Sequence, residues 1–163
     1  MSNQNTIPTI VISNFAEAHI DFHGRSDNPG ERDDLINGED YHGDRTILWA
    51  DDPKLVIVNY PIAHADFNTK RLGYPNTRHL APHEPTHYLC LDILREAHLL
   101  EGILQYAAPN GVVQLIPYAT TKEFLRLVEV MRKDYNLQVL TPESPDADHF
   151  WLRDYVDTKT GFR

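Results

Sequence analysis

The chain has 163 residues, of which 41% are hydrophobic and 24% are charged, as in an ordinary globular domain with one apolar core. The formal net charge of −9 argues against a surface for nucleic acid or anionic membrane, so we expect small-molecule or protein partners. A single cysteine, Cys90, excludes an internal disulfide and a cysteine-rich zinc site. No segment is typical of a membrane span or a secretory signal, and we expect a cytoplasmic location.

The first third of the chain predicts two buried strands separated by a long polar segment. Residues 9–13 (TIVIS) form the first expected strand, which ends at Asn14 and Phe15. Residues 16–44 are rich in glycine and acidic residues, and they predict a long loop with at most one short helix, around residues 31–36. The second expected strand covers residues 54–59 (KLVIVN).

The middle of the chain predicts shorter elements. Residues 63–72 favour a short helix, and residues 77–80 favour a short edge strand. The apolar positions between residues 88 and 108 keep helical spacing, although His98 or Gly102 could divide this segment into two helices.

Residues 111–140 give the clearest pattern in the chain, a strand, a helix and a strand. Thr120 and Glu123 fit a capping box at the start of the helix. Such a unit closes right-handed into a parallel sheet, so the turn at residues 117–121 should lie at the carboxyl edge, where open α/β folds place ligands. We therefore predict an α/β, Rossmann-like three-layer domain with a mostly parallel sheet over residues 8–156.

The candidate substrate-binding residues follow predicted strands at this edge. Asn14 and Phe15 come after the first strand, whereas Tyr118, Thr120 and Thr121 come after the strand that begins near residue 112. Each side chain offers a donor, an acceptor or a stacking face. Helix capping alone would also explain Thr120.

The histidines offer a possible metal site. If residues 19–23 were a strand, His19, Asp21 and His23 would lie on one side of it, with His42 downstream, as a set of metal ligands. A solvated loop explains the same residues, and no ligand pair follows at a diagnostic spacing. We therefore predict no bound metal.

Other motifs for catalysis are weak. Three histidines recur at four-residue intervals: His79, His83 and His87. Pro82 and Pro85 make a helix through them improbable. Cys90 is interpreted as a small core residue, and no glycine-rich phosphate loop or serine nucleophile motif occurs. The residues alone thus indicate an α/β domain with a polar site at the sheet edge.

Five stretches carry a resemblance to a known family, in matching order: residues 10–15 (IVISNF), 47–49 (ILW), 54–59 (KLVIVN), 114–121 (QLIPYATT) and 157–163 (DTKTGFR). Together they resemble the N-terminal, pre-ATP-grasp domain of ATP-grasp ligases, particularly peptide ligases of the pheganomycin type. The resemblance implies a Rossmann-like domain beside an ATP-grasp module, in cis or in trans, that helps to bind a small-molecule or peptide acceptor. In such ligases ATP phosphorylates a carboxylate, and an amine displaces the phosphate to form an amide.

The family's ATP-clamping lysines and magnesium ligands lie beyond the region that these 163 residues match. We therefore expect this chain to be inactive alone and to bind no cofactor itself, with ATP and Mg²⁺ bound in the full ligase. Residues 157–163 would begin the joint to the ATP-grasp module, and the expected interdomain residues are Lys159, Gly161, Phe162 and Arg163. Residues 1–7 are interpreted as a disordered lead-in.

Two other functions stay open. The first is a stand-alone binding or scaffold module without catalysis, and the second is a small metallohydrolase that uses His19, Asp21 and His23. Aromatic residues near the C-terminus, among them Phe150 and Trp151, predict an apolar patch that a neighbouring module or a second copy of the chain would cover. The reading frame after Arg163 would separate the ligase interpretation from the others.

Overall fold

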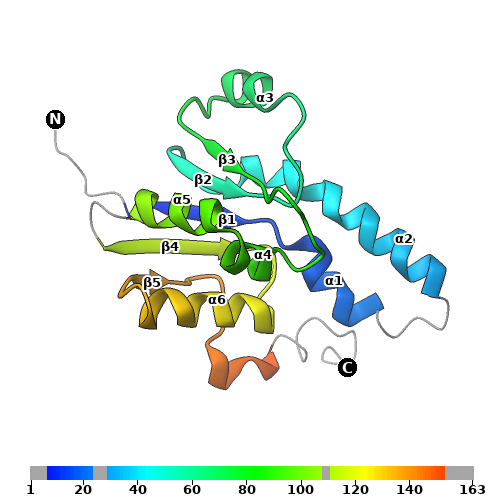
Figure 1. Ribbon diagram of the computed structural model, residues 1–163. Coiled ribbons are helices and arrows are strands. Elements are labelled where there is room, and N and C mark those ends of the chain that lie inside the picture. Colours follow the sequence, from blue (N-terminus) through cyan, green and yellow to red (C-terminus); the bar gives the residue numbers. More distant parts are fainter. Residues whose placement is uncertain (1–6, 24–28, 108–110, 153–163) are drawn as a thin grey trace, which may run out of the picture.

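Five parallel strands form one sheet, in the order β3-β2-β1-β4-β5 (Figure 1). The computed structural model describes residues 7–23, 29–107 and 111–152. The strands are β1 (Thr9–Ile12), β2 (Lys54–Ile57), β3 (Arg78–Leu80), β4 (Val112–Pro117) and β5 (Gln138–Leu140). Helices flank this sheet, so the prediction of an α/β, Rossmann-like three-layer fold is confirmed.

Two groups of helices cover the two faces of the sheet. The helices are α1 (Phe15–His23), α2 (Pro29–Asp40), α3 (Ala65–Leu72), α4 (Leu89–Arg95), α5 (Ala97–Ala107) and α6 (Lys122–Lys133), with 3-10 helices η1 (Tyr41–Leu48) and η2 (Ala147–His149). One apolar cluster joins α4, α5 and α6 to the sheet, and a second joins η1 and α3 to the opposite face. No helix within the described residues is both long and apolar enough to cross a membrane.

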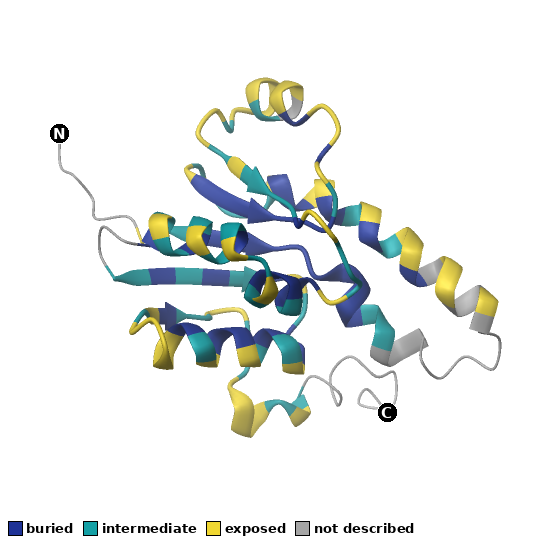
Figure 2. Ribbon diagram, in the orientation of Figure 1, coloured by how far each residue is buried: buried dark blue, intermediate teal, exposed yellow. Residues whose placement is uncertain are grey.

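Strands β1 and β2 are buried on both faces, which explains their continuous apolar runs (Figure 2). In β1, Ile10 and Ile12 pack in the cluster with α4 to α6, whereas Val11 packs in the cluster with η1. Lys54, at the start of β2, is also buried. Its Nζ donates to the carbonyl of Ala50 at 2.9 Å and lies 3.8 Å from the centre of the Tyr74 ring. Carbonyl and ring thus replace part of the water that this ammonium loses.

The prediction of a long loop over residues 16–44 is wrong, because this segment contains most of α1, all of α2 and the start of η1. The short helix allowed around residues 31–36 is present as part of α2. The acids and glycines that suggested a loop include Asp33, Asp34 and Gly38, which are exposed on α2. Ala16, Ala18 and Ile36 are buried. Tertiary packing of these few apolar positions therefore outweighs a poor intrinsic helix propensity.

The predicted capping box of α6 is displaced by one residue. Thr121, rather than Thr120, is the N-cap, and its Oγ1 accepts a hydrogen bond of 3.0 Å from the amide of Phe124. Glu123 is then the second residue of the helix and cannot complete a reciprocal box. The buried apolar face of α6 consists of four residues: Phe124, Leu127, Val128 and Met131.

The helical segment between residues 88 and 108 is divided, as the sequence allowed, but the division falls at Glu96. Gly102 lies inside α5, where a Cβ atom would collide with Leu80 Cδ1. Glycine at this position therefore allows α5 to approach the end of β3 closely.

Several predictions lie outside the described residues. They concern residues 1–6 of the lead-in and the interdomain residues Lys159, Gly161, Phe162 and Arg163.

Candidate functional site

The crevice between β1 and β4 is the point at which the strand order reverses. From β1 the chain proceeds outward to β2 and β3, and it then returns to the other side of β1 as β4. The carboxyl ends of strands at such a switch point are the usual ligand site of open α/β sheets. Asn14 and Phe15 follow β1 here, and Tyr118 follows β4. The fold therefore places the predicted residues from both strands at one edge.

Asn14 connects the two strand ends. Its Nδ2 donates to the carbonyl of Ala119 at 2.9 Å, and its Oδ1 accepts from the amide of Ala119 at 3.2 Å. The side chain is completely buried. Asn14 therefore holds the loop after β4 against the end of β1, and it fixes the relative position of the two loops that form the site.

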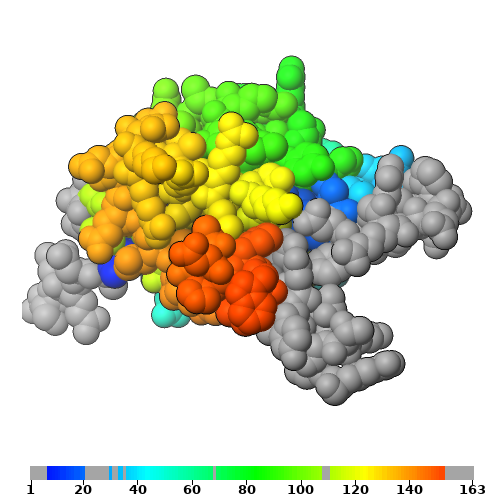
Figure 3. All heavy atoms as spheres, turned by 90° about the horizontal axis from the view of Figure 1, so that it is seen from below, coloured from blue at the N-terminus to red at the C-terminus, as the bar shows by residue number. Residues whose placement is uncertain are grey.

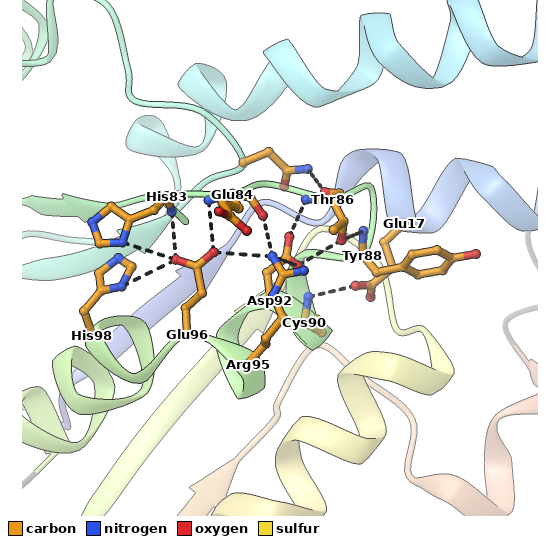
Figure 4. Close-up of polar contacts among 11 residues, drawn as sticks. Glu17, His83, Glu84, Thr86, Tyr88, Cys90, Asp92, Arg95, Glu96 and His98 are labelled. Atoms are coloured by element: carbon orange, nitrogen blue, oxygen red, sulfur yellow. Dashed lines mark hydrogen bonds and ion pairs between the residues drawn. The ribbon is translucent and has the colours of Figure 1, made fainter.

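Glu17 is a buried carboxylate that the sequence interpretation missed. Its Oε1 accepts hydrogen bonds from the Thr121 hydroxyl and, at 3.0 Å, from Asn14 Nδ2. Its Oε2 accepts from the amide of Cys90 at 2.9 Å (Figure 4). Burial raises the pKa of Glu17, and these hydrogen bonds oppose the shift. The carboxylate thus joins the starts of α1, α4 and α6.

Five rings lie near the buried Asn14 and Glu17 side chains at this edge of the sheet. We call them the aromatic cluster: Phe15, His19, His42, Trp49 and Tyr118. Phe15 and Tyr118 are stacked, with ring centroids 3.8 Å apart and planes 22° apart. Trp49 stacks on Tyr118 at 6.1 Å, and His42 meets Phe15 edge to face at 6.0 Å. Tyr118 is 36% exposed, so the cluster offers an aromatic surface to solvent.

A carboxylate lies beside the aromatic cluster. Glu39, near the end of α2, is 2.7 Å from His42 Nδ1 and 3.9 Å from His19 Nε2. His19 Nε2 also lies 3.3 Å from the Tyr118 hydroxyl. The site therefore combines aromatic faces with negative charge, a combination that suits a positively charged ligand group.

The predicted residues differ in how much surface they offer. Thr121 is buried as the helix cap, and Thr120 is also buried. Phe15 is buried beneath Tyr118. The structure thus brings Asn14, Phe15, Tyr118 and Thr121 together around one edge, and Tyr118 is the most exposed of the four.

A second polar arrangement lies beyond β2 and was also missed by the sequence interpretation. The buried Asp40 carboxylate is 2.8 Å from His87 Nδ1, and it accepts a hydrogen bond from Asn59 Nδ2. Burial raises the pKa of Asp40, and the contact with His87 opposes this shift. A carboxylate that accepts the Nδ1 proton of a neutral imidazole leaves the lone pair on Nε2, and the contact between Asp40 and His87 has the geometry of such an oriented general base.

A small hollow of about 140 Å³ borders Asp40, between Tyr41, Tyr60 and Gly43. Nearby, Asn59 Oδ1 is buried and accepts no hydrogen bond from a described residue. Buried acceptors are normally satisfied, so a ligand N–H or O–H that reached this oxygen would gain a hydrogen bond.

The proposed alignment of His19, Asp21 and His23 on one side of a strand is wrong, because these residues belong to α1. Positions two apart in a helix point in directions about 200° apart. The side chains of Asp21 and His23 lie outside the described residues, whereas His19 belongs to the aromatic cluster. The expectation that Pro82 and Pro85 prevent a helix is confirmed.

Two acidic residues fasten the segment between β3 and α4 (Figure 4). Asp92 accepts from the amide of Thr86 at 2.7 Å and from its hydroxyl at 2.9 Å. Glu96 accepts from the amides of His83 and Glu84 at 2.7 and 3.1 Å. This segment is therefore fixed on α4 by side-chain to backbone bonds.

A wider groove of about 690 Å³ runs along the outer side of α6, on the face seen in Figure 3. Its walls come from α6 and from residues 141–147, and they include none of the predicted site residues. Two of its basic residues are already engaged, because Arg132 donates to the carbonyl of Val139 and Lys133 pairs with Glu129. We therefore place the candidate site at the sheet edge.

Comparison with known proteins yields no relative: no family model matches the sequence, and no curated protein or solved structure matches the chain. The likeness to ATP-grasp ligases therefore remains a prediction from the five sequence stretches. The fold class itself rests on the sheet topology.

Proposed function

We propose that this chain is the acceptor-side domain of an ATP-grasp carboxylate–amine ligase, and that the aromatic cluster and Glu39 bind the amino group of the acceptor. The observation that carries the proposal is the position of the Phe15–Tyr118 stack at the switch point between β1 and β4. The Glu39 carboxylate lies at the same site.

The chemistry favours an amine over a carboxylate. An ammonium over an aromatic face gains about 0.5 to 2 kcal/mol, depending on how much water is removed. Glu39 adds attraction for a cation and repulsion for an anion, and the net charge of −9 acts in the same direction over longer distances. An amine is the acceptor that amide formation requires, so this preference agrees with the ligase interpretation.

The test is calorimetric titration of the full chain with a short C-terminally amidated peptide and with its N-acetylated counterpart. A gain of about 1.4 to 2 kcal/mol for the free amine corresponds to roughly 10- to 30-fold tighter binding. Tyr118→Ala and Glu39→Gln should remove this preference. Tyr135→Ala and Glu101→Gln, which change exposed residues outside the cluster, should retain it. Equal affinity for the two peptides would refute an amine site.

Binding and ligation are separate outcomes. A stand-alone binding module would also prefer the free amine. The ligase proposal further requires that the native protein, together with an ATP-grasp module, forms an amide from a carboxylate, ATP and the same peptide. It also requires that Tyr118→Ala raises the KM for the amine more than the KM for ATP. Amine binding without amide formation in that assay would favour the binding module.

A further inference from the structure

Two imidazoles and a carboxylate lie close together at the junction of α4 and α5. None of the three belongs to the aromatic cluster or to the hydrogen-bonded residues around Asn14. Glu96 Oε2 lies 3.5 Å from His83 Nδ1 and 3.6 Å from His98 Nδ1 (Figure 4). The three potential ligand atoms all lie within 4.8 Å of one another. His83 follows β3, Glu96 links α4 to α5, and His98 is in the first turn of α5. We call these residues the His–Glu–His cluster.

The carboxylate of this cluster is held in place before any ligand arrives. Its Oε2 accepts from the amide of His83, and its Oε1 accepts from the amide of Glu84 and from Arg95 at 3.4 Å. A carboxylate has about four lone-pair sites, so these bonds leave Oε2 able to bind a further partner on the side of the imidazoles. The guanidinium of Arg95 lies on the other oxygen.

The tautomer of His98 is also fixed. Its Nε2 lies 3.0 Å from the carbonyl of Ala81, which can only accept a hydrogen bond. Nε2 therefore carries the proton of the neutral ring, and Nδ1 directs its lone pair towards Glu96. Metal-binding histidines usually have this arrangement, in which the second ring nitrogen donates to a carbonyl or carboxylate.

The distances distinguish this cluster from the two His–carboxylate hydrogen bonds described above, although not from the 3.9 Å contact between His19 and Glu39. His42 lies 2.7 Å from Glu39, and His87 lies 2.8 Å from Asp40, the separation of a direct hydrogen bond. At the His–Glu–His cluster both separations are at or beyond the limit of such a bond. For a tetrahedral zinc site with bonds of about 2.0 to 2.1 Å, neighbouring ligand atoms are about 3.3 to 3.4 Å apart. In an octahedral site with bonds of about 2.1 Å, neighbouring ligand atoms are about 3.0 Å apart, which agrees less well with the observed separations of 3.5 and 3.6 Å.

Contrary to the prediction of no bound metal from the sequence, we propose that His83 Nδ1, Glu96 Oε2 and His98 Nδ1 bind one divalent transition-metal ion of the zinc class. Two histidines and one carboxylate form a ligand set that zinc uses with a fourth position open to water or substrate. His83 is 79% exposed at its side chain, so this fourth position would face solvent. The bound ion would also fasten the segment after β3 to the start of α5, and it would stabilise the folded chain by mass action.

The test uses the full chain without an affinity tag, because nine histidines already give several opportunities for weak binding. Zinc is titrated calorimetrically, and Co²⁺ is used as a probe whose visible spectrum reports tetrahedral geometry. The wild type should bind one Zn²⁺ per chain and show a tetrahedral Co²⁺ spectrum. His83→Ala and His98→Ala should each weaken binding about tenfold or more and abolish that spectrum.

His64→Asn is the matched control. It removes an exposed imidazole outside the cluster, and asparagine tolerates the positive φ of 59° at this position. This variant should bind zinc like the wild type. His83 is so exposed that His83→Ala should stay folded, which circular dichroism verifies even if His98→Ala unfolds. No saturable 1:1 binding by the wild type, or unchanged binding by a folded His83→Ala variant, would overturn the proposal.

Discussion

Thr121 donates its hydroxyl proton to the buried carboxylate of Glu17, 104 residues earlier in the chain. The same Oγ1 accepts from the amide of Phe124 and so caps α6. One hydroxyl therefore links the start of the helix after β4 to the start of the helix after β1. The two loops that form the candidate site depend on this link for their relative position.

We predict that Thr121→Val destabilises the protein by about 2 to 3 kcal/mol. The loss of the cap contributes about 1 kcal/mol, and the weakened solvation of a buried carboxylate contributes about 1 to 2 kcal/mol. Thr121→Ser keeps the hydroxyl and should retain most of the stability. Urea denaturation at neutral pH measures both variants. A loss below about 0.5 kcal/mol in Thr121→Val would show that the hydroxyl is dispensable.

The second prediction concerns the pH dependence of stability. Burial raises the pKa of Glu17 above its ordinary value of 4.5, so the folded protein binds this proton more tightly than the unfolded chain. The contribution of Glu17 to the free energy of unfolding therefore increases as the pH falls through the raised pKa. This gain is complete below the unfolded pKa, and it is absent at a pH above the folded pKa.

Glu17→Gln removes this titration and leaves the other titrating groups in place. The stability of the wild type relative to Glu17→Gln should therefore increase as the pH is lowered from neutral towards 4.5. Urea midpoints and slopes, measured for both proteins across this interval, give the difference. A constant difference would mean that Glu17 titrates alike in the folded and unfolded states.

The third prediction concerns Cys90, whose interpretation as a core residue is confirmed because the side chain is completely buried. Burial raises the pKa of its thiol well above the ordinary value, and the neighbouring Glu17 carboxylate adds to this effect. Since the thiolate is the reactive form, the native protein should not react with a thiol-specific disulfide reagent on the time scale of a free cysteine. Reaction should become fast in denaturant. Rapid labelling of the native state would contradict the buried position.

The sheet was predictable because β1 and β2 are buried on both faces and therefore have continuous apolar runs, such as residues 54–59. The carboxyl edge was predictable for the same reason, since the residue after each strand follows from the position of the strand. This reasoning identified Asn14 and Tyr118. It did not show that Asn14 is buried, because burial depends on a contact with Ala119 that is 105 residues away.

The remainder of the site had no local signal. Glu39 and His42 belong to a segment whose composition favours a loop, so their approach to His19 and Phe15 follows only from the packing of α1, α2 and η1. His83, Glu96 and His98 have no diagnostic metal spacing, because the turn between α4 and α5 brings them together. Sequence patterns report on faces and ends of elements, whereas these clusters depend on the contacts between elements.

The last prediction tests whether Asn14 sets the position of Tyr118. Asn14→Asp keeps the size of the side chain, but it replaces the donor to the Ala119 carbonyl with an acceptor and adds a charge beside Glu17. We expect a loss of about 3 to 5 kcal/mol, because an uncompensated charge would be buried. Asn14→Ala leaves both Ala119 groups without this partner, and it should cost about 2 to 3 kcal/mol.

If Asn14→Ala stays folded, its effect should extend to the aromatic cluster, because the residue it releases, Ala119, directly follows Tyr118. The fluorescence of Trp49, measured in a Trp151→Phe background, reports on the contact between Trp49 and Tyr118. Its emission should shift towards that of a solvated indole. An unchanged spectrum in a folded Asn14→Ala protein would show that the stack is positioned by its own packing, and the supporting role of Asn14 would then be limited to stability.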